Sequence, residues 1–344
     1  MVWIQKVKYF LSVIFLSFCK EFKSCNMYVK FWGVRGSVPT AIVHHEVKKK
    51  LEKALTYASP SDLLSPEKVE EFIESLPLSV KGTFGGNTTC VELRNSHDDI
   101  FIIDGGTGLP RFGRELMLSE KFRNGATLRM FFTHTHWDHI QGMMFFGPFF
   151  VPSNKVHIYS SFENIRERLQ YQTPSTHFPI KFDDLDIQKE YHFLPEGVEM
   201  AIDGIIVTSK AVRHPGTTYS YKFTDKGHKT FIFCSDAEFN LEVMHDIVQY
   251  IEYFKDADVL VFDTQYTFEE SLQRIDWGHS SAHIATDIAI KSNVKKLILF
   301  HHDPSYTDDK MDAMTLQALK YKELMAPLHP LEIETAYEGL ELTI

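Results

Sequence analysis

The sequence of 344 residues lacks the features of several protein classes. It contains no Pro/Ser/Gly-rich linker, no low-complexity run and no repeat of fixed period, which favours one large domain over a solenoid or a string of small units. No apolar run is long enough to span a bilayer, so we expect no membrane segment. The hydrophobic content of 44% is sufficient for a large buried core.

Basic residues are also in short supply. Lysine and arginine number 36 against 46 acidic residues, so the formal net charge is −10. This balance argues against an extended nucleic acid as a partner, because an acidic surface repels a polyanion. A small anionic substrate remains compatible, since bound divalent cations reverse the local field.

Cysteine is rare as well. The chain has four cysteines, with no CxxC pair and no disulfide framework: Cys19, Cys25, Cys90 and Cys234. Such cysteines indicate reduced thiols, and we therefore expect a cytoplasmic protein.

The first 26 residues differ from the rest of the chain. Lys6 and Lys8 precede an apolar run over residues 9–19, which has the length of a signal-peptide core. Phe18 stands before Cys19 and no A-x-A cleavage site follows, which argues against export. We interpret residues 1–26 as a dispensable extension, arising from an upstream start codon chosen in error, in preference to a signal. The domain then covers residues 27–344.

A dense group of metal-binding side chains follows one apolar segment. Residues 128–133 predict a short buried strand, and the next six residues contain three histidines and one aspartate. Open α/β sheets place their sites at the carboxyl ends of strands. His134 and His136 are spaced to bind one metal ion, and Asp138 and His139 to bind a second. Nitrogen and oxygen donors without thiolate suit zinc, manganese or iron.

This HxHxDH pattern resembles the signature of the metallo-β-lactamase superfamily, and the surrounding residues resemble its ribonuclease Z and cyclic-nucleotide phosphodiesterase branch. The resemblance implies an αββα sandwich, an α/β fold in which two mixed β-sheets pack face to face with helices on the outer faces. It also implies a dinuclear metal site along one edge. We expect two divalent ions per chain, with Zn²⁺ ahead of Mn²⁺ or Fe²⁺.

The resemblance assigns the remaining ligands to the ends of later strands. The turn at residues 212–216 is similar to the family's HPG turn and makes His214 the third imidazole of the first metal. An apolar strand ends in Asp236, the carboxylate expected to bridge both metals. Another strand ends at His301 and His302, which composition does not separate. The family's L-T-H pattern selects His301 for the second metal and leaves His302 as a neighbouring or substrate group.

Two further residues are implied as catalytic. The strand ending in Asp263 and the turn at residues 277–282 resemble the acidic strand end and HST turn of ribonuclease Z-like enzymes. There the histidine protonates the leaving oxygen and the carboxylate orients it, which assigns these roles to His279 and Asp263. Capping of the following helix is the alternative role for His279. Asp138 is expected to accept a proton, and Asp104 of the DGGTG turn to orient the metal-binding loop.

Residues 41–82 separate the opening FWGVRGSVPT segment from a Gly-Gly-Asn turn that close relatives reach sooner, so we interpret them as an insertion. Two helices are expected there, each with an apolar face that needs a surface to cover. The insertion either pads the fold, covers the site or forms a homodimer contact. In the opening segment, Arg35 and Ser37 either face the substrate or form a tight Gly/Pro turn. The apolar faces comprise Val47, Leu51, Ala54 and Leu55, then Val69, Phe72, Ile73 and Leu76.

The segment 160–200 bears on nucleic-acid binding. Ribonuclease Z is expected to carry a Gly/Pro-rich basic arm here, whereas this segment has four basic residues and eight acidic ones. We expect the arm to be absent and a loop that covers the substrate to take its place. Three histidines in and near the segment are interpreted as surface or packing residues: His157, His177 and His192.

We therefore predict a metal-dependent hydrolase that acts on a cyclic nucleotide or another small phosphodiester. Ribonuclease Z-like cleavage at tRNA 3′ ends is the first alternative, opposed by the acidic charge and the missing arm. Hydrolysis of a lactone or another acyl ester by the same metals is the second, which the HST-like turn disfavours. A metal-bearing protein without activity, assembled through the insertion, is the third, and the complete ligand set argues against it.

Overall fold

The computed structural model describes residues 27–239 and 247–344. The interpretation of residues 1–26 as an extension concerns a part of the chain outside these ranges. Among the helices within them, none is both long enough and apolar enough to cross a membrane.

The first of two seven-stranded sheets in the described ranges has the order β14-β1-β2-β3-β4-β5-β6. Neighbouring strands from β14 to β3 run antiparallel and those from β3 to β6 run parallel, so the sheet is mixed. Its strands are β1 (Tyr28–Gly33), β2 (Cys90–Arg94), β3 (Ile100–Ile103), β4 (Thr127–Phe132), β5 (Lys155–Ser160), β6 (Gln188–Phe193) and β14 (Glu341–Thr343).

The second sheet has the order β13-β12-β11-β10-β9-β8-β7. Strands from β13 to β10 run parallel and those from β10 to β7 run antiparallel, so this sheet is mixed as well. Its strands are β7 (Met200–Ile202), β8 (Ile205–Val212), β9 (Thr218–Thr224), β10 (Thr230–Cys234), β11 (Val259–Asp263), β12 (Lys296–Phe300) and β13 (Glu332–Thr335).

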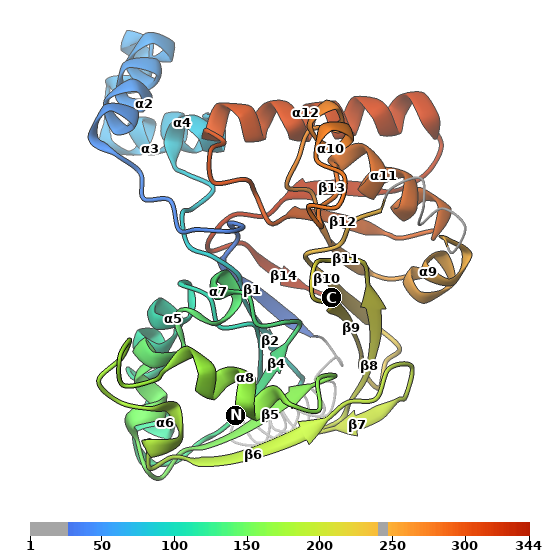
Figure 1. The fold of residues 1–344 in the computed structure, drawn as a ribbon. Helices are drawn as coiled ribbons and strands as arrows, with labels where there is room; N and C mark the ends of the chain where they lie inside the picture. Colours follow the sequence, from blue (N-terminus) through green and yellow to red (C-terminus); the bar gives the residue numbers. More distant parts are fainter. Residues whose placement is uncertain (1–26, 240–246) are drawn as a thin grey trace, which may run out of the picture.

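Helices cover the outer face of each sheet (Figure 1). Apolar side chains of α5, α6 and α8 pack on the first sheet, and those of α9, α11 and α12 pack on the second. The predicted αββα sandwich is therefore confirmed. The covering helices are α5 (Leu109–Leu116), α6 (Glu120–Asn124), α8 (Ile165–Gln172), α9 (Ile247–Phe254), α11 (Ala282–Lys291) and α12 (Asp308–Met325).

Further helices complete the fold. Those before β2 form the predicted insertion, and the others lie in loops between the strands. They are α2 (His44–Tyr57), η1 (Pro60–Leu63), α3 (Pro66–Ser75), α4 (Leu78–Lys81), α7 (Trp137–Ile140), η2 (Met143–Phe145), η3 (Gly147–Phe150), η4 (Phe182–Asp184) and α10 (Phe268–Gln273).

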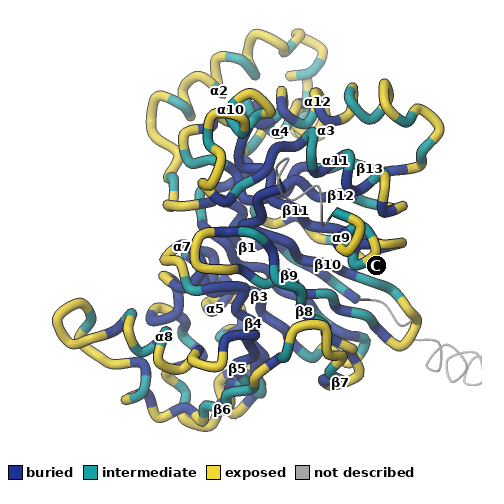
Figure 2. The backbone as a smooth tube through the Cα atoms, turned by 45° about the vertical axis from the view of Figure 1, so that its right-hand side comes forward, coloured by how far each residue is buried: buried dark blue, intermediate teal, exposed yellow. Residues whose placement is uncertain are grey.

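The strand β4 is largely apolar because both of its faces are buried. Phe131 points into the core between the two sheets, while Met130 and Phe132 point into the core beneath the outer helices. A central strand covered on both faces needs apolar side chains on both. Figure 2 shows the same burial along the neighbouring strands. β4 thus gives the loop that follows it a rigid base.

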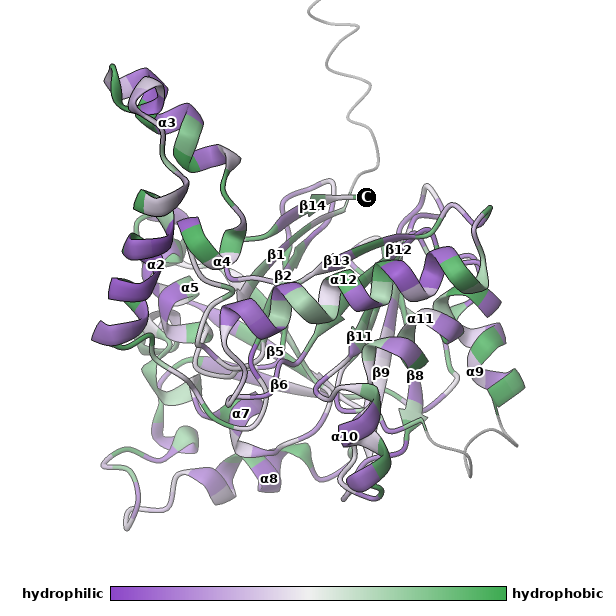
Figure 3. Ribbon diagram, turned by 90° about the horizontal axis from the view of Figure 1, so that it is seen from above, coloured by the Kyte–Doolittle hydropathy of each residue, from purple (hydrophilic) through white to green (hydrophobic). Residues whose placement is uncertain are grey.

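The predicted insertion forms helices, but its first apolar face is not buried. Val47, Leu51 and Leu55 of α2 are 41%, 61% and 70% exposed, and α2 and α3 project from the sandwich beside α12 (Figure 3). A polar contact holds α2 instead, since Lys50 forms an ion pair with Asp308 at 2.5 Å. The periodicity correctly predicts an apolar face on this helix, but it does not identify the surface that the face would cover. The three roles considered for the insertion stay predictions.

Replacement of Phe131 by alanine tests the core between the sheets. The Phe131 ring stacks on Tyr159 with 4.8 Å between centroids and meets Phe223 edge-on at 5.2 Å. We expect Phe131→Ala to lower the free energy of unfolding by about 3–5 kcal/mol, measured by urea denaturation. In the control Phe145→Ala, where the side chain is 63% exposed, we expect a change within about 0.5 kcal/mol. Similar losses in both variants would contradict this account of the core.

Candidate metal centre

The loop after β4 gathers its histidines at one end of the sandwich. β4 ends at Phe132, and α7 begins directly after His136. The His134 ring lies 4.4 Å from that of His136 and 4.2 Å from that of His139, measured between centroids. The predicted HxHxDH cluster is therefore compact in space as well as in sequence.

Residues of the second sheet complete the cluster. His214, Asp236 and His301 follow the carboxyl ends of β8, β10 and β12. The ring of His214 lies 5.0 Å from that of His134, and the ring of His301 lies 5.5 Å from that of His139. The centre thus forms where strand ends of the two sheets meet, and the structure brings together all seven residues that were predicted as ligands.

The two oxygens of Asp236 face different histidines. Oδ1 lies 3.0 Å from Nε2 of His139 and 3.2 Å from Nε2 of His301. Oδ2 lies 3.7 Å from Nε2 of His134 and 3.8 Å from Nε2 of His214. Two adjacent sets result, one of His134, His136 and His214, the other of Asp138, His139, Asp236 and His301. Asp236 stands between them, as a bridging carboxylate would.

Three of the histidines are oriented by hydrogen bonds from Nδ1. His139 donates to Asp104 at 2.7 Å, His134 donates to Thr133 Oγ1 at 3.2 Å, and His214 donates to the carbonyl of Gly278 at 2.9 Å. Each ring therefore turns Nε2 toward the centre, where this nitrogen can bind a metal ion. Gly278 has φ +89°, and a Cβ there would lie 2.2 Å from Nδ1 of His214, so only glycine fits this close approach.

The donor atoms suit divalent metal ions. Among the described residues, Nε2 of His134 and Nε2 of His139 are buried and make no hydrogen bond, an arrangement that is costly without a ligand. Burial also lowers the pKa of His134 well below its ordinary value, which keeps that ring neutral. Burial alone would raise the pKa of Asp236, but His139, His301 and His134 hold it well below the ordinary range. Neutral imidazoles and ionised carboxylates are the forms that bind zinc, manganese or iron.

Asp104 supports the metal-binding loop from behind. Its Oδ1 accepts the backbone N–H of Thr133 at 2.9 Å, and its Oδ2 accepts the hydroxyl of Thr133 and Nδ1 of His139, each at 2.7 Å. Asp104 is fully buried. One carboxylate thereby fixes both the start of the loop and the orientation of a histidine, which is the place that the sequence analysis gave it.

Several strands end in an unusual backbone conformation at this centre. Asp104, Asp236 and His301 have φ values of 58°, 52° and 63°. Such left-handed conformations cost energy in residues other than glycine and tend to be retained at functional sites. They turn each chain sharply as it leaves its strand and so direct the side chains into the centre.

His279 and Asp263 form a pair beside the metal centre. Nδ1 of His279 donates to Oδ2 of Asp263 at 2.7 Å, and the ring stacks 5.0 Å from that of His301. Burial lowers the pKa of His279, but the Asp263 carboxylate outweighs it and raises the pKa to about 9. One ring nitrogen of His279 lies within 4.8 Å of donor atoms of His214 and Asp236. The imidazole is held so that it can exchange a proton with a group bound at the centre.

The profile of the "Beta-lactamase superfamily domain" family matches residues 119–302, more than half of the chain. The chain belongs to the metallo-β-lactamase superfamily. Curated relatives include ribonuclease Z of Prochlorococcus marinus (strain NATL1A), 33% identical over 78 residues that make up 23% of each chain. Ribonuclease Z of Sulfurisphaera tokodaii is 43% identical over 54 residues, which make up 16% of this chain and 18% of that protein. The alignments thus cover under a quarter of these relatives.

Solved structures of this superfamily cover almost the whole chain. Unliganded yeast PDE1 matches 93% of this chain and 100% of its own, with a TM-score of 0.59 and 15% identity. The metallo-β-lactamase fold protein YhfI from Bacillus subtilis matches the same shares, with a TM-score of 0.58 and 16% identity. Human short-form tRNase Z matches 92% and 98%, with a TM-score of 0.55 and 15% identity. At these identities, the likeness establishes the fold.

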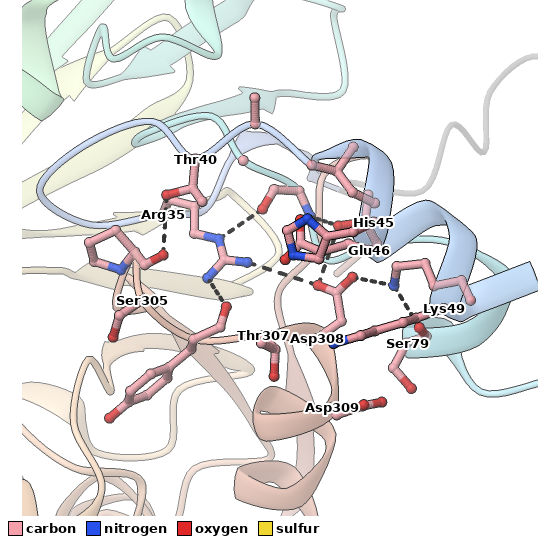
Figure 4. A pocket seen from close by; sticks show the side chains of 18 of the residues that line it. Arg35, Thr40, His45, Glu46, Lys49, Ser79, Ser305, Thr307, Asp308 and Asp309 are labelled. Carbon is pink, nitrogen blue, oxygen red and sulfur yellow. Dashed lines mark hydrogen bonds and ion pairs between the residues drawn. The ribbon is translucent and has the colours of Figure 1, made fainter. Parts of the chain in front are cut away.

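Arg35 holds neighbouring loops together and makes no contact with the predicted metal ligands. Its guanidinium donates to the carbonyls of Gly85, Asp303 and Tyr306 and lies 3.9 Å from Asp308. Figure 4 shows Arg35 and its contact with Asp308 at the wall of a cavity of about 840 Å³ between α2 and the start of α12. None of the predicted site residues lines that cavity. The reading of Arg35 as substrate-facing is therefore wrong, because its donors serve loop carbonyls.

Backbone groups that sequence reasoning missed also shape the centre. The N–H of Ser37 donates to Oδ2 of Asp138 at 2.7 Å and so anchors that carboxylate. The backbone N–H groups of Ala237 and Gln265 donate to the two oxygens of Asp263. Amide donors carry no residue-type signature, although the Gly-Ser sequence at positions 36 and 37 marked a tight turn.

The four other histidines named in the sequence analysis do not join the two ligand sets. His302 turns away from the centre and hydrogen-bonds the carbonyl of Ala336 at 2.8 Å, and burial followed by the charge of Arg35 lowers its pKa to about 3. His177 lies in a loop apart from the centre and hydrogen-bonds the hydroxyl of its neighbour. His157 and His192 lie side by side on β5 and β6, with 3.0 Å between ring nitrogens.

Replacement of Asp104 by asparagine tests the support behind the metal-binding loop. The variant loses the charge that fixes the Nδ1–H form of His139, while its size is unchanged. We expect zinc affinity to fall about 10- to 100-fold with the fold retained, measured by calorimetric titration of the metal-free protein. The control Asp186→Asn alters an exposed carboxylate elsewhere and should bind zinc normally. An unchanged affinity in Asp104→Asn would contradict the orienting role.

Proposed function

We propose that this protein is a metal-dependent phosphodiesterase that hydrolyses a cyclic nucleotide or another small phosphodiester. The observation that supports this most directly is the His279–Asp263 pair, with 2.7 Å between Nδ1 and Oδ2, beside the centre that Asp236 shares between two ligand sets. Hydrolysis of a phosphodiester expels an alkoxide, which is a poor leaving group and needs a proton. The pair provides a proton donor at the position where that need arises.

The residues of the chain divide the work. Two divalent ions, held by the two ligand sets around Asp236, would activate the attacking water and neutralise charge on the phosphoryl oxygens. Asp138, anchored by the N–H of Ser37, accepts a proton as the water attacks. Asp263 holds Nδ1–H of His279, so the other ring nitrogen carries the proton that passes to the leaving oxygen. Because Asp263 is itself fixed by two backbone N–H groups, the imidazole keeps its direction during the reaction.

Exposed aromatic side chains favour a substrate that contains a nucleobase. Trp137 stands between two ligands of the HxHxDH motif and is 78% exposed, and Trp277 precedes His279 by two residues and is 61% exposed. The guanidinium of Arg274 lies 5.8 Å from the centroid of the Trp277 ring. Aromatic faces of this kind stack nucleobases without regard to sequence. A small nucleotide would meet such a surface on either side of the metal centre.

Ribonuclease Z-like cleavage at tRNA 3′ ends is the second candidate. The identity with two ribonuclease Z proteins supports it, although it covers under a quarter of each. The net charge of −10 opposes it. In the segment where a basic arm would be expected, Arg166 pairs with Asp183 and Lys189 donates to the carbonyl of Leu185. These partners already offset two of the four positive charges in the segment, which lowers its attraction for an RNA backbone.

A substrate panel separates the candidates. Cyclic mononucleotides, dinucleotides, pre-tRNA and lactones are assayed with Mn²⁺ and with Zn²⁺. We expect the highest kcat/KM on a cyclic or small nucleotide phosphodiester. Preferred cleavage of pre-tRNA would replace this proposal by the second candidate. Preferred hydrolysis of lactones would mean that the protein is an acyl hydrolase and not a phosphodiesterase.

Replacement of His279 by alanine tests the proton donor. The alkoxide of a natural phosphodiester needs a proton, whereas p-nitrophenolate leaves readily without one. We expect His279→Ala to lose about 10²- to 10⁴-fold in kcat on the natural substrate and far less on bis(p-nitrophenyl) phosphate, with its metal content unchanged.

The control for this variant is His97→Ala. It removes an exposed histidine in the loop between β2 and β3, and it should behave as the unaltered protein on both substrates. Equal losses of His279→Ala on both substrates would mean that His279 positions the substrate or supports the metals. Full activity on both would return His279 to the alternative role of capping the helix.

A further inference from the structure

A second group of metal-binding side chains lies on the first sheet, away from the centre already described. β5 and β6 are parallel neighbours, and their register places His157 opposite Glu190 and Tyr159 opposite His192. Since side chains two residues apart share a face of a strand, these residues project together. Arg129, the register partner of His157 on β4, precedes His134 by five residues, which is about 16 Å along the strand.

Three donor atoms converge in this group. Nδ1 of His157 lies 3.0 Å from Nε2 of His192 and 3.4 Å from Oε2 of Glu190. Nε2 of His192 lies 3.9 Å from the same oxygen. Two nitrogens bound to one tetrahedral zinc ion lie about 3.3 Å apart, given zinc–nitrogen bonds of about 2.0–2.1 Å. The observed spacing therefore needs only a small adjustment to accept an ion.

The primary centre offers an internal standard for this spacing. There, Nε2 of His214 lies 3.1 Å from Nδ1 of His136, in a set whose donor atoms all fall within 4.8 Å of one another. His157, Glu190 and His192 meet the same criterion. The two groups thus present their imidazole nitrogens to each other in the same way.

Stacking holds the two imidazoles in place. The His192 ring stacks on Tyr159 with 4.5 Å between centroids and 16° between planes, and the His157 ring lies 5.2 Å from that of His192. Tyr159 is itself buried and stacks on Phe131 in the core. Rings fixed in this way lose little freedom when they bind an ion. Burial and the neighbouring His157 also lower the pKa of His192, which favours its neutral form.

The group is open enough for an ion to enter. The side chains of His157 and His192 are 23% and 32% exposed, and that of Glu190 is 57% exposed. An ion bound here would keep room for a water molecule as fourth ligand. Within the described ranges, β6 is also the edge strand of its sheet, with β5 as its one neighbour. A shared ion would join the two strands through their side chains.

We propose that His157, Glu190 and His192 form a separate binding site for one divalent transition-metal ion, with zinc as the preferred ion. The site cross-links the edge strand β6 to β5 and stabilises that edge of the sandwich. It takes no part in hydrolysis. The interpretation of His157 and His192 as ordinary packing residues is thereby replaced, while that of His177 is kept.

Zinc stoichiometry of the full chain tests the proposal. Protein stripped of metal is titrated with Zn²⁺ alone, and bound zinc is measured by mass spectrometry under native conditions. We expect three ions in the unaltered chain and two in His157→Ala/His192→Ala. The matched control His177→Ala, which removes an exposed histidine outside the group, should keep three. Equal zinc content in the unaltered chain and the double variant would overturn the proposal.

A second variant, Glu190→Gln, tests the proposal if the double variant fails to fold. Glu190→Gln keeps the size of a largely exposed side chain and both imidazoles. We expect it to weaken the third zinc by at least tenfold and to reduce the rise in Tm that zinc causes, while metal at the primary centre and hydrolytic activity stay unchanged. A third zinc ion bound with unaltered affinity would mean that Glu190 is not one of its ligands and would overturn the three-residue site, and loss of activity would mean that this group serves the catalytic centre.

Discussion

The carboxylate of Asp236 is the constraint on which the candidate centre depends. It is buried at the end of β10, a strand with neighbours on both sides, and each of its oxygens faces two histidines. Ser235 donates to Oδ1 at 2.6 Å and helps to fix the group. A buried charge is tolerated only where partners compensate it. The surrounding imidazoles and the two metal ions they are proposed to bind supply that compensation.

Much of this centre could be predicted from local patterns. The HxHxDH motif places four of its residues in one loop, whereas His214, Asp236 and His301 were assigned through the resemblance to the family, each just after a strand. The choice between His301 and His302 has a backbone explanation that the sequence does not display. His301 adopts a φ of 63°, which turns the next residue away, so that His302 reaches the carbonyl of Ala336 instead of the centre.

Other features could not be predicted, because they depend on which segments become neighbours. The donors of Arg35 are occupied by three carbonyls from two separate loops, and no local pattern marks a carbonyl as an acceptor. The apolar face of α2 has the expected periodicity, yet among the residues that the structure describes it stays largely exposed. His157 and Glu190 are 33 positions apart and meet only through the register of β5 and β6, which a single sequence does not determine.

The peptide at Gly278 links two parts of the centre that have different chemical roles. Its carbonyl accepts the hydrogen bond from His214, and the next residue is His279. Since a Cβ at this position would overlap the His214 ring, a substitution here would displace a ligand and the residue beside it in one step. Metal affinity and the proton donation proposed for His279 are therefore coupled through this turn. Adaptation to new substrates has to proceed at exposed neighbours such as Trp277, where a change leaves the turn intact.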